Sequence, residues 1–148
     1  MGGAIVTFPL GWVAWALLSA FFAALTAIFA KVGVANINSD LATFIRTIVI
    51  AVVLCAILLA RGLFQPLDTI SPRTYLFLAL SGLATGASWL CYFRALQIGE
   101  AALVAPIDKL SVVLVAIFGV IFLREQLTSV NWIGIAMIAS GAILVAWR

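Results

Sequence analysis

The sequence predicts an all-α integral membrane protein with five transmembrane helices. Hydrophobic residues make up 66% of the 148-residue chain, charged residues make up 9%, and histidine is absent. Five apolar segments each approach the roughly 20 residues that cross about 30 Å of hydrocarbon as a helix. Strands of a membrane barrel would instead be about 10 residues long and alternate in polarity, unlike these continuously apolar segments. The segments are residues 12–30, 41–60, 75–93, 101–122 and 130–147.

The first segment is expected to be a permanent transmembrane helix. The residues before it contain no Lys or Arg, and the apolar stretch is too long for a cleavable signal. Residues 33–40, which are rich in Gly, Asn and Asp, then supply the turn to the second segment. We expect a single domain over residues 1–148, which leaves no room for a soluble catalytic domain.

The third and fifth segments carry small residues at a spacing that lets helices approach closely. Gly82 and Gly86 form a GxxxG arrangement in the third, which follows the longest loop, and Ala136 and Ser140 repeat the spacing in the fifth. Four tryptophans fall near the predicted helix ends, where an indole ring prefers the headgroup level, so we interpret them as interface anchors. They are Trp12, Trp89, Trp132 and Trp147.

The fourth segment contains two adjacent charged residues, Asp108 and Lys109. At mid-membrane each of these charges raises the free energy of insertion by about 2.5–3.5 kcal/mol, whereas each Leu, Ile, Val or Phe lowers it by about 0.3–0.6 kcal/mol. The net free energy of inserting this helix is therefore close to zero. Two interpretations stand: the pair packs helices together, or it forms a polar site on a transport path. We favour the second, because charges inside membranes are functional by default.

Depth in the membrane predicts a partner for Asp108. Arg46 lies about a turn and a half into the second helix and Asp108 about two turns into the fourth, and both helices start from the same side. We therefore expect an interhelical Arg46–Asp108 pair. Adjacent residues on a helix point about 100° apart, so Lys109 should remain the unpaired cation. Lys31 and Arg94 border the same half of the membrane, and we interpret them as side chains that snorkel to the interface.

Two further residues of the fourth helix are candidate site residues. Pro106 removes a backbone hydrogen bond just before the charged pair, and it either bends the helix there or marks an ordinary helix start. Ser111 follows Asp108 on the same helix face and either lines the path with it or donates a hydrogen bond back to its own helix. The predicted substrate-binding residues are Lys109, Asp108, Arg46, Ser111 and Pro106.

The loop cations give little preference for one orientation. An odd number of helices places the termini on opposite sides, and three cations fall on each side, so the positive-inside bias is weak. Either other features set the orientation, or the chain inserts both ways and two copies meet antiparallel as an inverted repeat. One side holds Arg61, Arg73 and Arg124, and the other holds Lys31, Arg94 and Arg148.

Two stretches resemble a known family. They are residues 28–50, IFAKVGVANINSDLATFIRTIVI, and residues 92–144, YFRALQIGEAALVAPIDKLSVVLVAIFGVIFLREQLTSVNWIGIAMIASGAIL. Six residues in them fall where the family pattern places such residues: Lys31, Arg46, Pro106, Glu125, Gly134 and Gly141. With these, the chain resembles the EamA-like family of the drug/metabolite transporter superfamily, specifically its single-repeat members with five helices. It departs from the family at Leu25 and Thr26, where the first helix commonly has tryptophan and glycine.

The resemblance implies secondary transport of a small polar metabolite across the cytoplasmic (inner) membrane by a dimer. We expect an antiparallel homodimer; a parallel dimer or a heterodimer with a paralogue is the alternative. Counting Arg46, Asp108 and Lys109, the buried charge is net positive, which favours an anionic or zwitterionic solute. Asp108 is the only deep acid that could carry a coupling proton. Related multidrug exporters use an acidic residue in the first helix, which this chain lacks, so cationic drug efflux is the weaker transporter hypothesis.

The alternative hypothesis comes from another class of function: the chain is a non-transporting membrane subunit that scaffolds or regulates a larger complex. An enzyme is not expected, because there is no clustered set of metal ligands and no recognisable nucleophile with its base. We likewise expect no cofactor and no bound metal. The few cations are spread over both faces and form no basic stripe, so nucleic acid is not an expected partner.

Overall fold

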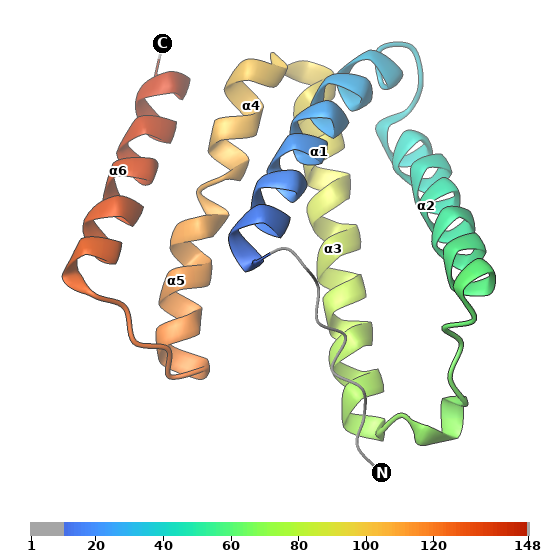
Figure 1. The fold of residues 1–148 in the computed structure, drawn as a ribbon. Helices are drawn as coiled ribbons and strands as arrows, with labels where there is room; N and C mark the ends of the chain where they lie inside the picture. The colour runs from blue at the N-terminus through green and yellow to red at the C-terminus, as the bar shows by residue number, and fades with distance from the viewer. Residues whose placement is uncertain (1–10, 148) are drawn as a thin grey trace.

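The computed structural model describes residues 11–147, and within that range every regular element is helical (Figure 1). The helices are α1 (Trp12–Gly33), α2 (Ser39–Arg61), the short 3₁₀ helix η1 (Leu67–Thr69), α3 (Pro72–Ile98), α4 (Ala101–Asp108), α5 (Ser111–Phe122) and α6 (Ser129–Ala146). Taken together, α4 and α5 make one span of 22 residues, so these helices form five segments long and apolar enough to cross a membrane. The prediction of an all-α membrane protein with five transmembrane helices is confirmed.

Local turn chemistry sets where the helices begin and end. The Asn38 side chain accepts hydrogen bonds from the backbone N–H groups of Asp40 and Leu41, at 2.8 and 3.1 Å, and thereby caps the start of α2. Ser71 caps α3 by accepting from the Thr74 N–H, and Pro72 occupies the first turn. At the other end of α2, Gly62 adopts φ +61°, a left-handed conformation that glycine tolerates without strain.

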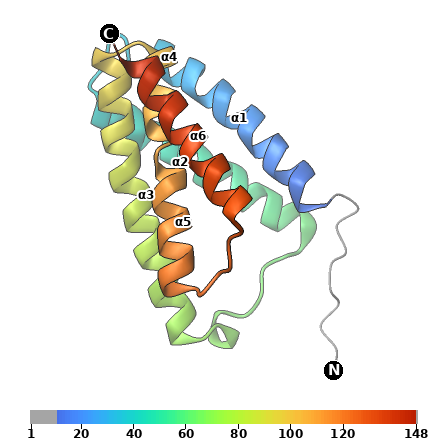
Figure 2. The same cartoon turned by 90° about the vertical axis from the view of Figure 1, so that its left-hand side faces the viewer.

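The helices pack most closely at one end of the helix bundle. In Figure 1 the α1–α2 connection, the α3–α4 connection and the end of α6 all lie at the top. A small core forms there from Ala30, Val34, Ala42, Phe93 and Leu96. Below it, α1 and α2 lean away from α3 (Figures 1 and 2), and much of their apolar surface is exposed in the single chain.

Two polar side chains tie this packed end together. The Lys31 ammonium donates to the Leu96 carbonyl at 2.6 Å and to the Gly99 carbonyl at 2.8 Å. These carbonyls lie at the C-terminus of α3, where the helix itself supplies no N–H partner. The Gln97 amide donates to the Ile37 carbonyl at 2.9 Å, in the α1–α2 connection. The interpretation of Lys31 as a residue that only snorkels to the interface is therefore incomplete, since its partly buried ammonium also donates to two backbone carbonyls at the end of α3.

Candidate substrate site

Arg46 lies against two aromatic rings of α3. Its guanidinium carbon is 4.0 Å from the centroid of the Trp89 ring and 5.3 Å from that of Phe93. A guanidinium over an aromatic face gains roughly 0.5–2 kcal/mol, more as water is excluded. Trp89 and Phe93 are four residues apart and so lie on the same face of α3. Together they hold a half-buried cation at the level of the membrane span.

The predicted ion pair between Arg46 and Asp108 is wrong. Within residues 11–147, Arg46 has no carboxylate within 4.0 Å, and the one ion pair found joins Lys109 to Asp108 at 3.2 Å. Equal depth along the membrane normal does not make two helices neighbours. Here α2 packs against α3, whose aromatic rings occupy the position beside the guanidinium.

The Asp108–Lys109 pair lies where the fourth span is interrupted. The α4 helix ends at Asp108 and α5 begins at Ser111, and the long Lys109 side chain bends back to reach the Asp108 carboxylate. The expectation that these two residues cannot pair with each other is therefore wrong as well. Their side chains are 36% and 57% exposed, respectively, which places the pair at an open surface of the single chain.

Backbone hydrogen bonds show how the interruption is built. The Lys109 N–H is shared between the carbonyls of Ala105 and Pro106, at 3.3 and 3.1 Å, and the Leu110 N–H bonds the Ile107 carbonyl at 3.0 Å. Such bonds to the residue three positions back tighten the chain into 3₁₀ turns. Pro106, which has no N–H to donate, is the sixth residue of α4. It therefore lies inside an interrupted helix and does not mark an ordinary helix start.

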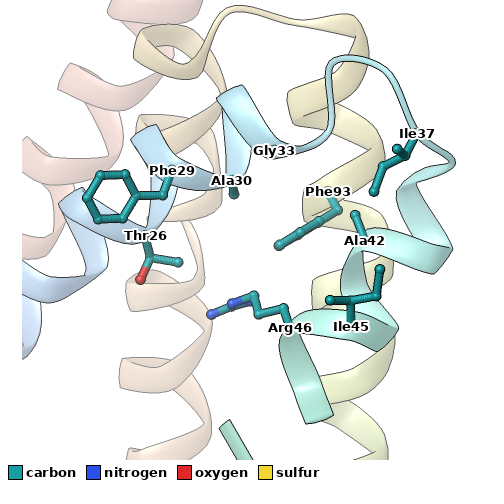
Figure 3. Close-up of a pocket in the computed structure, with 9 residues that line it drawn as sticks. All are labelled: Thr26, Phe29, Ala30, Gly33, Ile37, Ala42, Ile45, Arg46 and Phe93. Atoms are coloured by element: carbon teal, nitrogen blue, oxygen red, sulfur yellow. The ribbon is translucent and has the colours of Figure 1, made fainter. Parts of the chain in front are cut away.

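Arg46, Lys109 and Asp108 each line a different cavity in the described part of the chain. The first, of about 360 Å³, lies between α1, α2 and α3 and holds Arg46 (Figure 3). The second, of about 500 Å³, lies between the small residues of α1 and the side chains of Pro106 and Lys109. The third, of about 220 Å³, is lined by Asp108. Ser111 is exposed and lines none of these three.

Four of the five predicted site residues are thus distributed over three cavities, and Ser111 is the exception. Tyr92 of α3 lines both the second and the third, so it separates the surroundings of Lys109 from those of Asp108. Sequence reasoning missed Tyr92 and Phe93, and it interpreted Trp89 as an interface anchor. That interpretation is wrong, because the Trp89 ring is half-buried against Arg46. The spacing of Trp89 and Phe93 was the available signal, since two aromatic rings on one helix face can hold a cation.

Comparisons with known proteins agree with this architecture. The model of the EamA-like transporter family matches residues 10–147. The chain is 67% identical over 135 residues to an "uncharacterized transporter in cobO 3′ region" from a Sinorhizobium species, which covers 91% of this chain and 96% of the relative. It is 27% identical over 130 residues to an uncharacterized protein of Methanocaldococcus jannaschii, covering 88% and 92% of the two chains. No solved structure matches the chain. The family model spans all five membrane-crossing segments, and the chain belongs to the EamA-like transporter family.

Proposed function

We propose that the protein is a secondary transporter that carries a small anionic or zwitterionic metabolite across the cytoplasmic membrane. The observation that supports this most strongly is Arg46, a cation inside a membrane span that lines a cavity and has no acidic partner among the described residues. A charge held in a membrane segment without a counter-ion is costly. A solute that supplies the missing negative charge would be stabilised there.

The arrangement of the other charges favours an anion over a cation. Asp108 is neutralised by Lys109 at 3.2 Å, so the net charge of the three residues resides on Arg46. A cationic drug would need an acidic group that it could reach without displacing Lys109. An anion needs only the guanidinium, which lies in the first cavity (Figure 3).

The interrupted helix supplies the moving part of the proposed mechanism. Broken helices at membrane depth are tolerated where they line a cavity, and they often carry the binding groups of transporters. Here the break places Lys109 at the second cavity and Asp108 at the third. Asp108 is our candidate for a coupling proton, because its protonation would release Lys109 to a substrate.

A dimer would complete the transport path. The proposed partner is a second copy in the opposite orientation, which would build an inverted repeat from one sequence. The odd number of spans and the even distribution of loop cations support this arrangement. Reporter proteins fused to the C-terminus should then be found on both sides of the membrane. A C-terminus confined to one side would refute the antiparallel form.

Uptake by sealed proteoliposomes tests the function. The purified wild-type chain would be given a panel of labelled anionic, zwitterionic and cationic metabolites, with empty liposomes as the control. We expect saturable uptake of at least one anion or zwitterion and none of the cations. Flux restricted to cations would refute the proposed substrate class. No flux for any solute in either direction would favour a scaffolding subunit.

A further inference from the structure

We infer that the cavity between α1, α2 and α3 binds a small monocarboxylate with a compact apolar body, and that Arg46 holds its carboxylate. This deepens the proposed function by naming the substrate class, and it rests on that function only for the movement of the bound solute. The cavity volume of about 360 Å³ is in the range of small-molecule sites. The argument comes from three properties of its lining.

The first property is the orientation of the guanidinium. One face of Arg46 is covered by Trp89, and its nitrogen atoms point into the cavity (Figure 3). Those N–H groups donate no hydrogen bond to any residue in the 11–147 range. A guanidinium is planar and matches a carboxylate with two parallel hydrogen bonds. The Trp89 ring thus fixes the plane of the guanidinium, and the N–H edge of the guanidinium stays available to a ligand.

The second property is the single charge of the cavity. Among the residues that the structure describes, Arg46 is the only charged one that lines it, so one negative charge on the ligand is neutralised. A phosphate dianion would bring a second charge with no partner into a low-dielectric site, which is costly. A carboxylate meets the requirement with one charge and the correct planar shape.

The third property is the division between polar and apolar lining. Ala30, Ala42 and Phe93 present apolar surface suited to a hydrocarbon body (Figure 3). Thr26 of α1 supplies one hydroxyl, which makes no hydrogen bond within the described part of the chain. By contrast, Thr43 and Thr47 donate to the carbonyls four residues before them, at 2.9 and 2.8 Å. The Thr26 hydroxyl is therefore available to a second atom of the ligand.

A lipid phosphate is the competing occupant. Arg46 lies seven residues after Ser39, about 10 Å along the helix at 1.5 Å per residue. The hydrogen bonds of Lys31 and Gln97 join α1 and the α1–α2 connection to the end of α3 at that membrane face. Because Gly33 and Ile37 at this face also line the cavity, a lipid headgroup is tested as a competitor below.

Equilibrium binding to the full chain in phosphatidylcholine nanodiscs tests the inference. The probe is radiolabelled benzoate, and its competitors are neutral benzamide, cationic benzylamine and dianionic phenyl phosphate. We expect saturable benzoate binding that is weakened at least about tenfold in Arg46→Gln, because two charge-assisted hydrogen bonds are lost. Arg94→Gln, which removes an exposed cation from α3, is the matched control and should bind as the wild type does.

Further variants keep the test decisive if Arg46→Gln fails to insert. Arg46→Lys keeps the charge without the planar fork and should bind benzoate with intermediate affinity. Thr26→Val should weaken binding a few-fold, since it removes one hydrogen bond, whereas Thr47→Val should not. Equal affinity for benzoate and benzamide, or unchanged affinity in the Arg46 variants, would overturn the inference.

Two outcomes separate this inference from its alternatives. If phosphatidylglycerol displaces benzoate at a salt concentration that screens the disc surface, Arg46 binds lipid and the inference is overturned. Because binding is measured without flux, a protein that binds benzoate through Arg46 but moves no solute would refute transport alone. A protein that transports anions while Arg46→Gln keeps full benzoate affinity would refute the binding site alone.

Discussion

Replacing Lys31 with methionine should destabilise the packed end of the protein by about 2–4 kcal/mol. The Lys31 ammonium donates to the Leu96 and Gly99 carbonyls at 2.6 and 2.8 Å. Hydrogen bonds that involve a charged group contribute about 1.5–3 kcal/mol each, so two bonds set an upper limit of about 6 kcal/mol. Lys31 is only partly buried, and water or headgroups can satisfy part of what is lost, which lowers the expected value.

The assay is reversible unfolding of the purified protein in mixed micelles by a denaturing detergent, followed by circular dichroism. Lys31→Met keeps most of the aliphatic stem, so the measured change reports the ammonium rather than packing. Arg94→Met, a cation lost from an exposed position of α3, is the control and should unfold as the wild type does. If Lys31→Met also unfolds as the wild type does, the two hydrogen bonds do not stabilise the fold and our account of this end is wrong.

Three other predictions concern the charged residues. In double-mutant cycles, the losses in free energy of unfolding caused by Arg46→Leu and Asp108→Leu should add within about 0.5 kcal/mol. The losses caused by replacing Asp108 and Lys109 should instead depart from additivity by about 0.2–1 kcal/mol. The reverse result would restore an Arg46–Asp108 ion pair. Pro106→Ala should supply the missing N–H to the Ala102 carbonyl, seen as a slowly exchanging amide at residue 106, and reduce proteoliposome flux; unchanged flux would mean that Pro106 has no role in transport. Lys109→Met should insert normally and lose flux, and full flux would return Lys109 to a structural role.

The sequence predicted the membrane spans well because their physical basis is local. Hydrophobicity and length decide whether a segment crosses the bilayer, and both can be read directly from the chain. The turn at residues 33–40 was also readable, since Asn38 caps α2 with its own side chain. The helix ends were less accurate: the third was predicted over 75–93, whereas α3 extends from Pro72 to Ile98. That error made Trp89 look like a residue near a helix end.

The partners of the charged residues were harder to predict. Depth along the membrane normal can be counted from the sequence, but the angular position of one helix around another cannot. The match between Arg46 and Asp108 failed for this reason. The hydrogen bonds of Lys31 were missed because its acceptors are backbone carbonyls, which every residue carries and which therefore leave no pattern in the sequence. The same holds for the carbonyls of Pro106 and Ile107, which accept the 3₁₀ hydrogen bonds of Lys109 and Leu110.

Anion flux in Arg46 variants tests the central claim most directly. Proteoliposomes with equal amounts of wild-type, Arg46→Gln, Arg46→Lys and Arg94→Gln protein would be loaded with unlabelled substrate and diluted into the labelled anion, so that exchange is measured without an imposed ion gradient. Our account predicts exchange by the wild type and Arg94→Gln, reduced exchange by Arg46→Lys, and a loss of at least about tenfold in Arg46→Gln. Undiminished exchange by a correctly inserted Arg46→Gln protein would contradict it.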